Sequence, residues 1–307
     1  MSGGPVAALS SDGLTLHLQH GPTDLIITAD GSSTARTACF ARARAALDGV
    51  IEGLVGELAQ LRQPAASRPR VRGAVARLMV EATANFEGSF VTPMASVAGA
   101  IADHVLAASW IQGLERLTVN NGGDIAFELG EGATTTIGVV TSLLERRVIG
   151  SIVIHAASPV RGVATSGWRG RSFSLGIADA VTVLARNAAL ADAAASVIAS
   201  AVDLPGHPGI TRVPARELDE SSDLGDRLVT RDVGPLGSQE RRQALEPGIA
   251  LAEDLLHRGV IAGAHLVIGD THVSLRHESD SDRAPLIELG TDATRAIQGA
   301  SPSDAVD

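Results

Sequence analysis

Val119-Asn120-Asn121-Gly122-Gly123-Asp124-Ile125-Ala126 joins two runs in which apolar residues alternate with polar or small ones. The alternation, from Leu117 to Phe127, predicts a strand, a tight turn and a second strand. The Asn-Gly-Gly sequence favours the positive backbone angles that such a reversal requires. Two adjacent glycines would also let a flat ligand approach the backbone, with Asp124 as an acceptor at the rim. An ordinary hairpin followed by an acidic residue is the alternative interpretation.

The composition predicts a globular protein with a substantial core, because the chain has 307 residues of which 45% are hydrophobic. The formal net charge of −10 and the aromatic content of 2% argue against nucleic-acid and anionic-membrane partners. A single cysteine, Cys39, excludes an internal disulfide and has no companions for a zinc site. A cytoplasmic location is therefore expected, without a signal peptide or membrane anchor in residues 1–9.

Strand-like and helix-like patterns follow one another along the chain. Further strands are predicted over residues 14–27, 134–141, 148–155, 180–185, 260–268 and 272–277. Helices are predicted over residues 34–62, 94–112, 188–202 and 239–258, and residues 204–237 are expected to form an ordered covering loop. In the first helix, Gly49, Gly53 and Gly56 suggest a close neighbour. The helix over 94–112 has a narrow face that would let it lie close to a sheet or a ligand, while Asp103 and His104 are interpreted as a solvated end.

Two segments rich in arginine predict loops. Residues 64–72 carry two prolines and three arginines, which is typical of a solvated loop, with phosphate binding as the alternative. Residues 168–176 are rich in Arg, Ser and Gly. That composition suits contact with an anion or a ring, or a merely exposed loop, equally well.

Asp192 and Ser196 form a candidate metal site, because their four-residue spacing puts both side chains on one face of a helix. Together with Asp124 or Asp179 on loops they would offer hard oxygen ligands, which suit Mg²⁺ better than zinc or iron. A buried helix residue satisfied by a neighbouring loop is the alternative for Asp192. The familiar nucleotide-binding motifs are absent, and the nine scattered histidines show no convincing metal spacing.

Five motifs follow one another in the chain: Thr92–Ala100, Val119–Ile125, Ala164–Gly167, Ala178–Val183 and Ala191–Ser196. In this order they resemble an uncharacterised bacterial and archaeal family of the ApbE-like superfamily, which is related to the FAD:protein FMN transferases but distinct from them. The resemblance extends to His277. It implies an α/β (α+β) fold of mostly antiparallel sheets with packed helices. We expect one unit over residues 1–277 and a flexible C-terminal tail over 278–307.

The resemblance also implies the site. ApbE proteins proper are Mg²⁺-dependent transferases that cleave FAD and attach FMN to a threonine of a target protein. The turn Asn120-Asn121-Gly122-Gly123-Asp124 is similar to their Gly-Gly-Asp turn beside the flavin nucleotide, and Thr165-Ser166-Gly167 is similar to their Thr-Ser-Gly loop. Asp192 and Ser196 resemble the Asp and Thr of their metal-binding motif. The implied cofactors are Mg²⁺ and FAD or a related flavin.

Two departures from the transferases stand out. Transferases have Lys-Gly-Tyr-Ala where this chain has Ala98-Gly99-Ala100-Ile101, so an ammonium group that could neutralise pyrophosphate is missing. They also have His-Ile-Ile-Asp-Pro where this chain has residues 173–179 without a histidine, which puts the usual proton transfer in doubt. Arg169 and Arg171 are the candidate replacements as anion contacts.

Three functions are compatible with these observations. The first is a transferase-type enzyme that acts on a flavin or related heteroaromatic nucleotide with Mg²⁺. The second is a non-catalytic flavin- or pterin-binding protein. The third is a catabolic or redox enzyme for a small nitrogen heterocycle. We expect a small-molecule ligand as partner and neither nucleic acid nor a membrane; an oligomer is compatible with the sequence.

Overall fold

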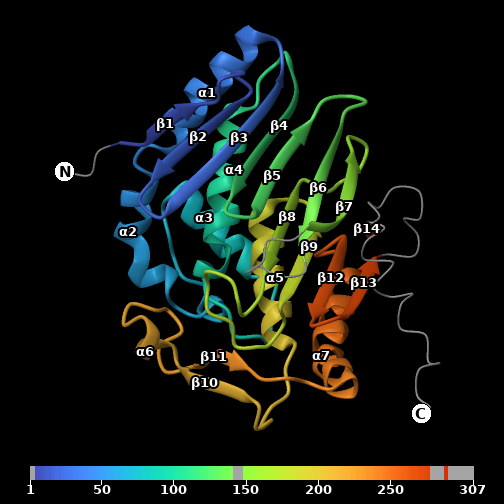
Figure 1. Cartoon of the computed structure of the whole chain (residues 1–307). Helices are drawn as coiled ribbons and strands as arrows, with labels where there is room; N and C mark the ends of the chain where they lie inside the picture. Colours follow the sequence, from blue (N-terminus) through green and yellow to red (C-terminus); the bar gives the residue numbers. More distant parts are fainter. Residues whose placement is uncertain (1–3, 141–147, 277–286, 290–307) are drawn as a thin grey trace.

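A computed structural model describes residues 4–140, 148–276 and 287–289 (Figure 1). Its main feature is one nine-stranded sheet, in which neighbouring strands are antiparallel. In spatial order its strands are Val6–Leu9 (β1), Thr15–His20 (β2), Thr23–Gly31 (β3), Leu114–Asn121 (β4), Asp124–Leu129 (β5), Gly162–Ser166 (β8), Ala180–Ala185 (β9), Gly263–Ile268 (β12) and Thr271–Arg276 (β13).

Helices cover one face of this sheet and enclose the main core (Figure 1). The α-helices are Ser33–Leu47 (α1), Val50–Leu61 (α2), Ala74–Thr83 (α3), Val97–Ser109 (α4), Ala188–Ala201 (α5), Ala215–Leu218 (α6) and Ser238–His257 (α7). Two short 3₁₀ segments, Ala65–Ser67 (η1) and Pro93–Ser96 (η2), precede α3 and α4. The alanine-rich α5 is buried along most of its length and packs on β8 and β9, which places it at the centre of the molecule.

A second sheet packs on the opposite face of the large one, in the order β14-β7-β6. Its strands are Thr134–Val140 (β6), Val148–His155 (β7) and Ile287–Leu289 (β14). Apolar side chains of β5, β6, β7 and β9, among them Phe127, Ile137, Ile152 and Leu184, form a smaller core between the two sheets. The predicted flexible tail, residues 278–307, includes β14; the remainder of that range lies outside the described residues.

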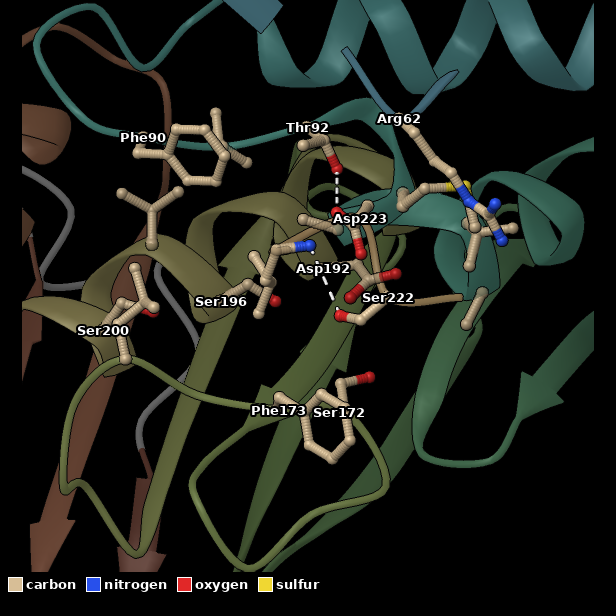
Figure 2. A pocket seen from close by; sticks show the side chains of 18 of the residues that line it. Arg62, Phe90, Thr92, Ser172, Phe173, Asp192, Ser196, Ser200, Ser222 and Asp223 are labelled. Carbon is tan, nitrogen blue, oxygen red and sulfur yellow. Dashed lines mark hydrogen bonds between the residues drawn. The ribbon is translucent and has the colours of Figure 1, made fainter. Parts of the chain in front are cut away.

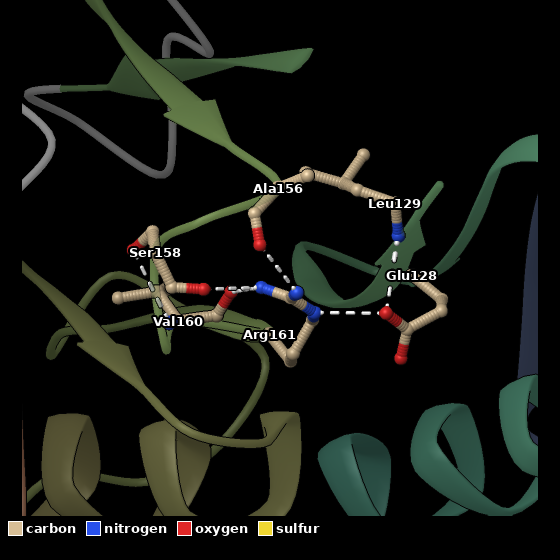
Figure 3. Close-up of polar contacts among 6 residues, drawn as sticks. All are labelled: Glu128, Leu129, Ala156, Ser158, Val160 and Arg161. Carbon is tan, nitrogen blue, oxygen red and sulfur yellow. Dashed lines mark hydrogen bonds and ion pairs between the residues drawn. The ribbon is translucent and has the colours of Figure 1, made fainter. Parts of the chain in front are cut away.

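Arg161 fixes the entry to β8 (Figure 3). Its Nε atom donates to a carboxylate oxygen of Glu128 at 3.0 Å, and its other guanidinium nitrogens donate to the carbonyls of Ala156, Ser158 and Val160 at 2.6–2.9 Å. A guanidinium with all these acceptors is held in one orientation. The strand that carries Thr165 and Ser166 is therefore anchored to β5 directly before the site.

The covering segment, residues 204–237, is ordered as predicted and has structure of its own. It contains α6 and an antiparallel pair, Ile210–Pro214 (β10) with Leu228–Val233 (β11). Thr230 attaches it to the loop before β9, because its N–H donates to the Ser174 carbonyl at 2.9 Å and its hydroxyl donates to the Gly176 carbonyl at 2.8 Å.

The prediction of one helix over residues 34–62 is wrong, since the chain breaks between α1 and α2. Gly49 has φ 73°, a left-handed conformation that ends the first helix and starts the second. A Cβ atom at Gly53 or Gly56 would meet nothing within 4 Å, so these glycines do not mark a close neighbour. The predicted class, helices packed on mostly antiparallel sheets, is confirmed. Each helix within the described residues is too short or too polar to cross a lipid bilayer.

Candidate functional site

The predicted turn between β4 and β5 is confirmed as a two-residue reversal. Asn121 pairs with Asp124, and the two residues between them have positive φ, 68° at Gly122 and 116° at Gly123. Asn120 accepts the N–H of Gly123 through its side-chain oxygen at 2.8 Å. The Asn121 side-chain amide donates to the Ala98 carbonyl at 3.1 Å, which attaches the turn to α4. Both asparagines thus hold the backbone of the turn.

The narrow face of α4 lies against the start of α5 at Gly99, and α4 also packs on β4 and β5. A Cβ atom at Gly99 would overlap the carbonyl of Ala188 at the start of α5. Only glycine permits this approach, which brings the two helix N-termini side by side. The distance between α4 and α5 therefore depends on Gly99.

Each of these two helices supplies an aspartate to the N-terminus of the other. Asp103 on α4 accepts the N–H groups of Ala188 and Ala189 at 2.9 and 2.8 Å. Asp192 on α5 accepts the N–H of Gly99 at 3.0 Å. Carboxylates are favourable there because the first N–H groups of a helix have no partner within it. The interpretation of Asp103 as part of a solvated end is wrong.

A cavity of about 410 Å³ opens beside this junction (Figure 2). Four of the predicted site residues line it: Asp124, Arg171, Asp192 and Ser196. Figure 2 shows Asp192 and Ser196 of α5 near the middle of the view, with Arg62 and Phe90 on either side and Phe173 below them. The covering segment closes the remaining wall with residues 219 and 221–224.

Arg171 lies over the turn. A Cβ atom at Gly122 would overlap its Nη2 atom, so the absence of a side chain there gives the guanidinium its place. Burial raises the pKa of Asp124 from 3.8 to about 7, while the backbone of Thr165 and the positive charge of Arg171 act in the opposite direction. The turn therefore places the guanidinium of Arg171 where its positive charge favours the ionised form of Asp124.

Asp192 has an even less favourable environment for its negative charge. Burial is the main cause that raises its pKa well above 3.8, and the charges of Asp124 and Asp103 raise it further. Hydrogen bonds from the backbone of Gly99 and Ala98 only partly offset this. Two desolvated carboxylates in one cavity would be stabilised by a cation.

The donor set fits a hard cation that shares its coordination with a ligand. Asp124, Asp192 and Ser196 offer oxygen atoms, and no group of three His, Cys, Asp or Glu side chains in the described part of the chain is arranged to hold a metal alone. Mg²⁺ is commonly bound by one or two carboxylates plus substrate phosphates and water. The cavity matches that pattern better than a closed all-protein metal site.

The Thr165-Ser166-Gly167 loop supports the cavity from behind. The hydroxyls of Thr165 and Thr182 are hydrogen-bonded at 2.9 Å, and the Ser196 hydroxyl reaches that of Ser166 at 3.5 Å. A Cβ atom at Gly167 would overlap the carbonyl oxygen of Asp179, so glycine is needed for this packing. These three residues lie next to the cavity lining and are not part of it.

Arg169 and Asp179 lie outside the cavity lining, in a contact of their own. Arg169 pairs with Asp179 at 3.4 Å and covers the Trp168 ring at 4.5 Å from its centroid. Asp179 also accepts the indole N–H of Trp168 at 3.1 Å and the N–H of Gly269 at 2.7 Å. The structure thus separates Arg169 from Arg171, although only one residue lies between them.

Several lining residues were not singled out from the sequence: Arg62, Phe90, Thr92, Phe173, Asp219 and Asp223. The Thr92 hydroxyl donates to a carboxylate oxygen of Asp223, as the upper dashed line in Figure 2 shows. A signal was present for Phe173, because the chain has only five phenylalanines and this one follows Arg171 in the polar loop. Its ring is 37% exposed, which is unusual for a phenylalanine.

Known proteins similar to this chain come from methanogenic archaea and from the flavin transferases. A UPF0280 protein of Methanothrix thermoacetophila is 39% identical over 113 residues, covering 36% of this chain and 46% of the relative. A UPF0280 protein of Methanopyrus kandleri is 39% identical over 125 residues, covering 40% and 47%. The chain thus spans about half the length of the curated relatives it matches. The apo flavinyl transferase ApbE of Pseudomonas stutzeri is similar in structure, with a TM-score of 0.43 and 12% identity over 91% of this chain and 96% of that chain.

A family whose description is "AbpE bacteria" matches residues 7–276. That range contains the turn, the two helices that exchange aspartates and every residue that lines the cavity. The match confirms the resemblance that the five sequence motifs indicate. The chain belongs to the AbpE bacteria family.

Proposed function

We propose that the cavity binds a phosphate-bearing planar heteroaromatic ligand of the flavin-nucleotide type, together with Mg²⁺. The observation that carries this proposal is the placement of Arg171 over Gly122 and beside Asp124, in the same cavity as Asp192 and Ser196. Membership of the AbpE bacteria family supports a flavin-related ligand. The cavity volume of about 410 Å³ lies within the usual range for small-molecule sites.

Charge balance supports a ligand that brings both an anion and a metal. Four aspartates and two arginines line the cavity. Arg171 lies near Asp124, and the charge of Arg62 acts on Asp219. Asp192 and Asp223 have backbone or hydroxyl donors as their polar partners, so neither carboxyl group has a cationic partner among the described residues.

Asp124, Asp192 and Ser196 would hold Mg²⁺, which when bound neutralises phosphate charge and polarises a phosphoryl oxygen. Arg171 would bind the phosphate itself, because a planar guanidinium can donate two parallel hydrogen bonds to it. Gly122 leaves the space for this guanidinium, and the α4–α5 junction holds Asp192 in place. The residues of the chain thus orient the ligand through its phosphate.

Phe90 and Phe173 would bind the ring. Both side chains line the cavity in a chain whose aromatic content is 2%. The Arg227 guanidinium lies 3.3 Å from the centroid of the Phe90 ring and fixes its orientation. Offset stacking on such rings contributes about 0.5–1.5 kcal/mol beyond the area that is buried.

Ligand binding without group transfer is the second candidate function, and one observation favours it. The sequence contains no lysine, and no histidine is found among the described residues that line the cavity. The ammonium and the imidazole of the transferases therefore have no counterpart there. Incubation with FAD, MgCl₂ and a threonine-containing acceptor peptide, followed by chromatography and mass spectrometry, separates the two functions. Only a transferase breaks the pyrophosphate bond, releases AMP and leaves FMN bound to the threonine hydroxyl of the peptide.

Calorimetric titration with riboflavin, FMN and FAD, in MgCl₂ and in EDTA, tests the proposal. FMN should bind more tightly than riboflavin. The difference in affinity between the two flavins should be larger in MgCl₂ than in EDTA. Arg171→Gln should remove the preference for FMN. Arg169→Gln is the matched control, because the same change two residues away affects the pair with Asp179 outside the cavity. If the wild type binds none of the three flavins in MgCl₂, the proposal is wrong.

A further inference from the structure

We propose that Arg68, Arg70 and Arg72 form a docking surface for an acidic, extended peptide segment of a partner protein. We call these three residues the arginine strip. They lie in a stretch, residues 58–80, that contains five arginines and no acidic residue, in a chain whose net charge is −10. This stretch of the chain is therefore basic, and a group of exposed positive charges attracts anionic partners.

The arginines of the strip are not used by the fold. All three are exposed, whereas Pro69 is buried and Val71 packs against the main core. Seven arginines elsewhere are ion-paired; no ion pair of the strip is found within the described residues. The nearby Glu57 carboxylate accepts the backbone N–H groups of Arg72 and Gly73 at 2.6 and 2.7 Å. The guanidinium groups thus stay available while their backbone is held.

One residue of the strip has a left-handed backbone. Arg68 ends η1 with φ 52° and ψ 62°, and it is the single non-glycine residue with positive φ in the described part of the chain. Glycine adopts this conformation without a steric cost, whereas an arginine in it lowers the stability of the fold. Strain of this kind concentrates at functional positions.

The position of the strip connects it to the site. Arg62, which precedes it, lines the cavity. The N–H of Ala65 donates to the carbonyl of Val91, another lining residue, at 2.8 Å. A segment bound on the strip would therefore continue toward the cavity wall.

The spacing of the strip favours a peptide over a single small anion. Burial alternates along residues 68–72, so the exposed arginines occupy every second position of a segment that forms neither helix nor strand. The Cα atoms of alternate residues lie at most about 7 Å apart. Acidic side chains at alternate positions of an extended peptide lie about this far apart, and each can pair with one guanidinium.

Fluorescence anisotropy on the full chain tests this proposal without a flavin, so its result is independent of the proposed function. The probe is a short labelled peptide of alternating glutamate and alanine, and a peptide of glutamine and alanine is its control. At low ionic strength only the acidic peptide should bind. The triple variant Arg68→Gln, Arg70→Gln, Arg72→Gln should weaken this binding by about tenfold or more and reduce its salt dependence.

A second triple variant, Arg231→Gln, Arg242→Gln, Arg276→Gln, removes the same charge from exposed positions elsewhere. It should change the affinity by less than about twofold, because exposed charges at a distance are screened. Equal losses in both triple variants, or no binding by the wild type, would overturn the proposal. The proposal would also be overturned if the triple variant of the arginine strip lost affinity for FAD and kept its affinity for the peptide.

Arg68→Gly distinguishes a docking residue from a structural one. Glycine relieves the positive φ, so the thermal midpoint should rise while the affinity for the acidic peptide falls. A variant that gains stability with unchanged peptide affinity would remove Arg68 from the docking surface.

Discussion

The Nη2 atom of Arg171 occupies the place where a Cβ atom of residue 122 would lie. Gly122 and Arg171 are far apart in the sequence, yet the turn accepts the guanidinium only because it has no side chain. Gly123, the next residue, has no neighbouring atom within 4 Å of such a Cβ position. The paired glycines of the turn therefore have different roles, although both have positive φ.

Gly122→Ala should displace Arg171 and remove the preference for FMN over riboflavin. Gly123→Ala is its control, because both changes place a side chain at positive φ and only the first overlaps the guanidinium. The backbone strain is about 1–2 kcal/mol in the left-handed region of Gly122 and larger at Gly123, whose φ of 116° lies outside that region. Urea denaturation should therefore show that Gly123→Ala also loses unfolding free energy. Calorimetry should show a loss of FMN affinity for Gly122→Ala alone; equal FMN affinities would mean that Arg171 does not bind the phosphate.

Asp103→Ala should lower the unfolding free energy by about 1–2 kcal/mol, because it leaves the first N–H groups of α5 without their acceptor. His104→Ala, on the same helix and next in sequence, controls for the loss of a polar side chain. The Mg²⁺ dependence of FMN binding should persist in Asp103→Ala. A variant as stable as the wild type would contradict the exchange of aspartates between α4 and α5.

Asp192→Asn should preserve the contact with Gly99, since an amide oxygen can still accept its N–H, but should remove the Mg²⁺-dependent part of FMN binding. Ser196→Thr should keep the Mg²⁺-dependent part of FMN binding. Ser196→Ala should reduce it, but less than Asp192→Asn does. The measurement is the thermal midpoint with FMN, in MgCl₂ and in EDTA. A ligand at a hundredfold excess over its dissociation constant adds about 2.7 kcal/mol. A wild type with the same midpoint in both solutions would exclude a metal at Asp192.

His265 should add a term to the unfolding free energy that rises with pH between about 4 and 6.5. Burial, and then the charge of His272, lower the pKa of His265 from 6.5 to about 4. Between these values the unfolded chain binds a proton that the folded protein excludes, so acid favours unfolding. By linkage, the unfolding free energy lost through His265 between pH 6.5 and pH 4 is about 3 kcal/mol.

The variant His265→Asn isolates this effect, since asparagine can still bond to Ser274 and does not titrate. Asp103, Asp124 and Asp192 act in the opposite direction, because burial raises the pKa of each carboxyl group above 3.8. The comparison is therefore the difference between the wild type and the variant in urea denaturation across the pH range. Parallel curves would show that His265 keeps its ordinary pKa in the folded protein.

The sequence was sufficient for features that depend on neighbouring residues. The turn at Gly122 and Gly123 follows from local backbone chemistry, and the shared face of Asp192 and Ser196 follows from helical spacing. Gly49 shows where local reasoning failed, because a glycine tolerated inside a helix and a glycine that ends one look alike in a periodic pattern. In the structure Gly49 has φ 73° and stands directly before α2.

The rest of the cavity depends on tertiary structure. Arg62, Phe90 and Asp223 belong to segments that no periodicity relates to one another, and the fold brings them together. Arg169 and Arg171 looked equivalent in the sequence. In the structure Arg169 pairs with Asp179, whereas the guanidinium of Arg171 lies over Gly122. The position of each arginine thus depends on contacts that the local sequence does not reveal.

The hydrogen bond between Thr92 and Asp223 joins residues 131 positions apart. Contacts of this sequence separation are slow to form, because a long loop must close before they stabilise anything. During synthesis, which proceeds from the N-terminus, the β4–β5 hairpin and α4 leave the ribosome long before residues 219–224. The nascent chain therefore acquires its cavity wall late, and ligand binding becomes a marker for the completion of folding.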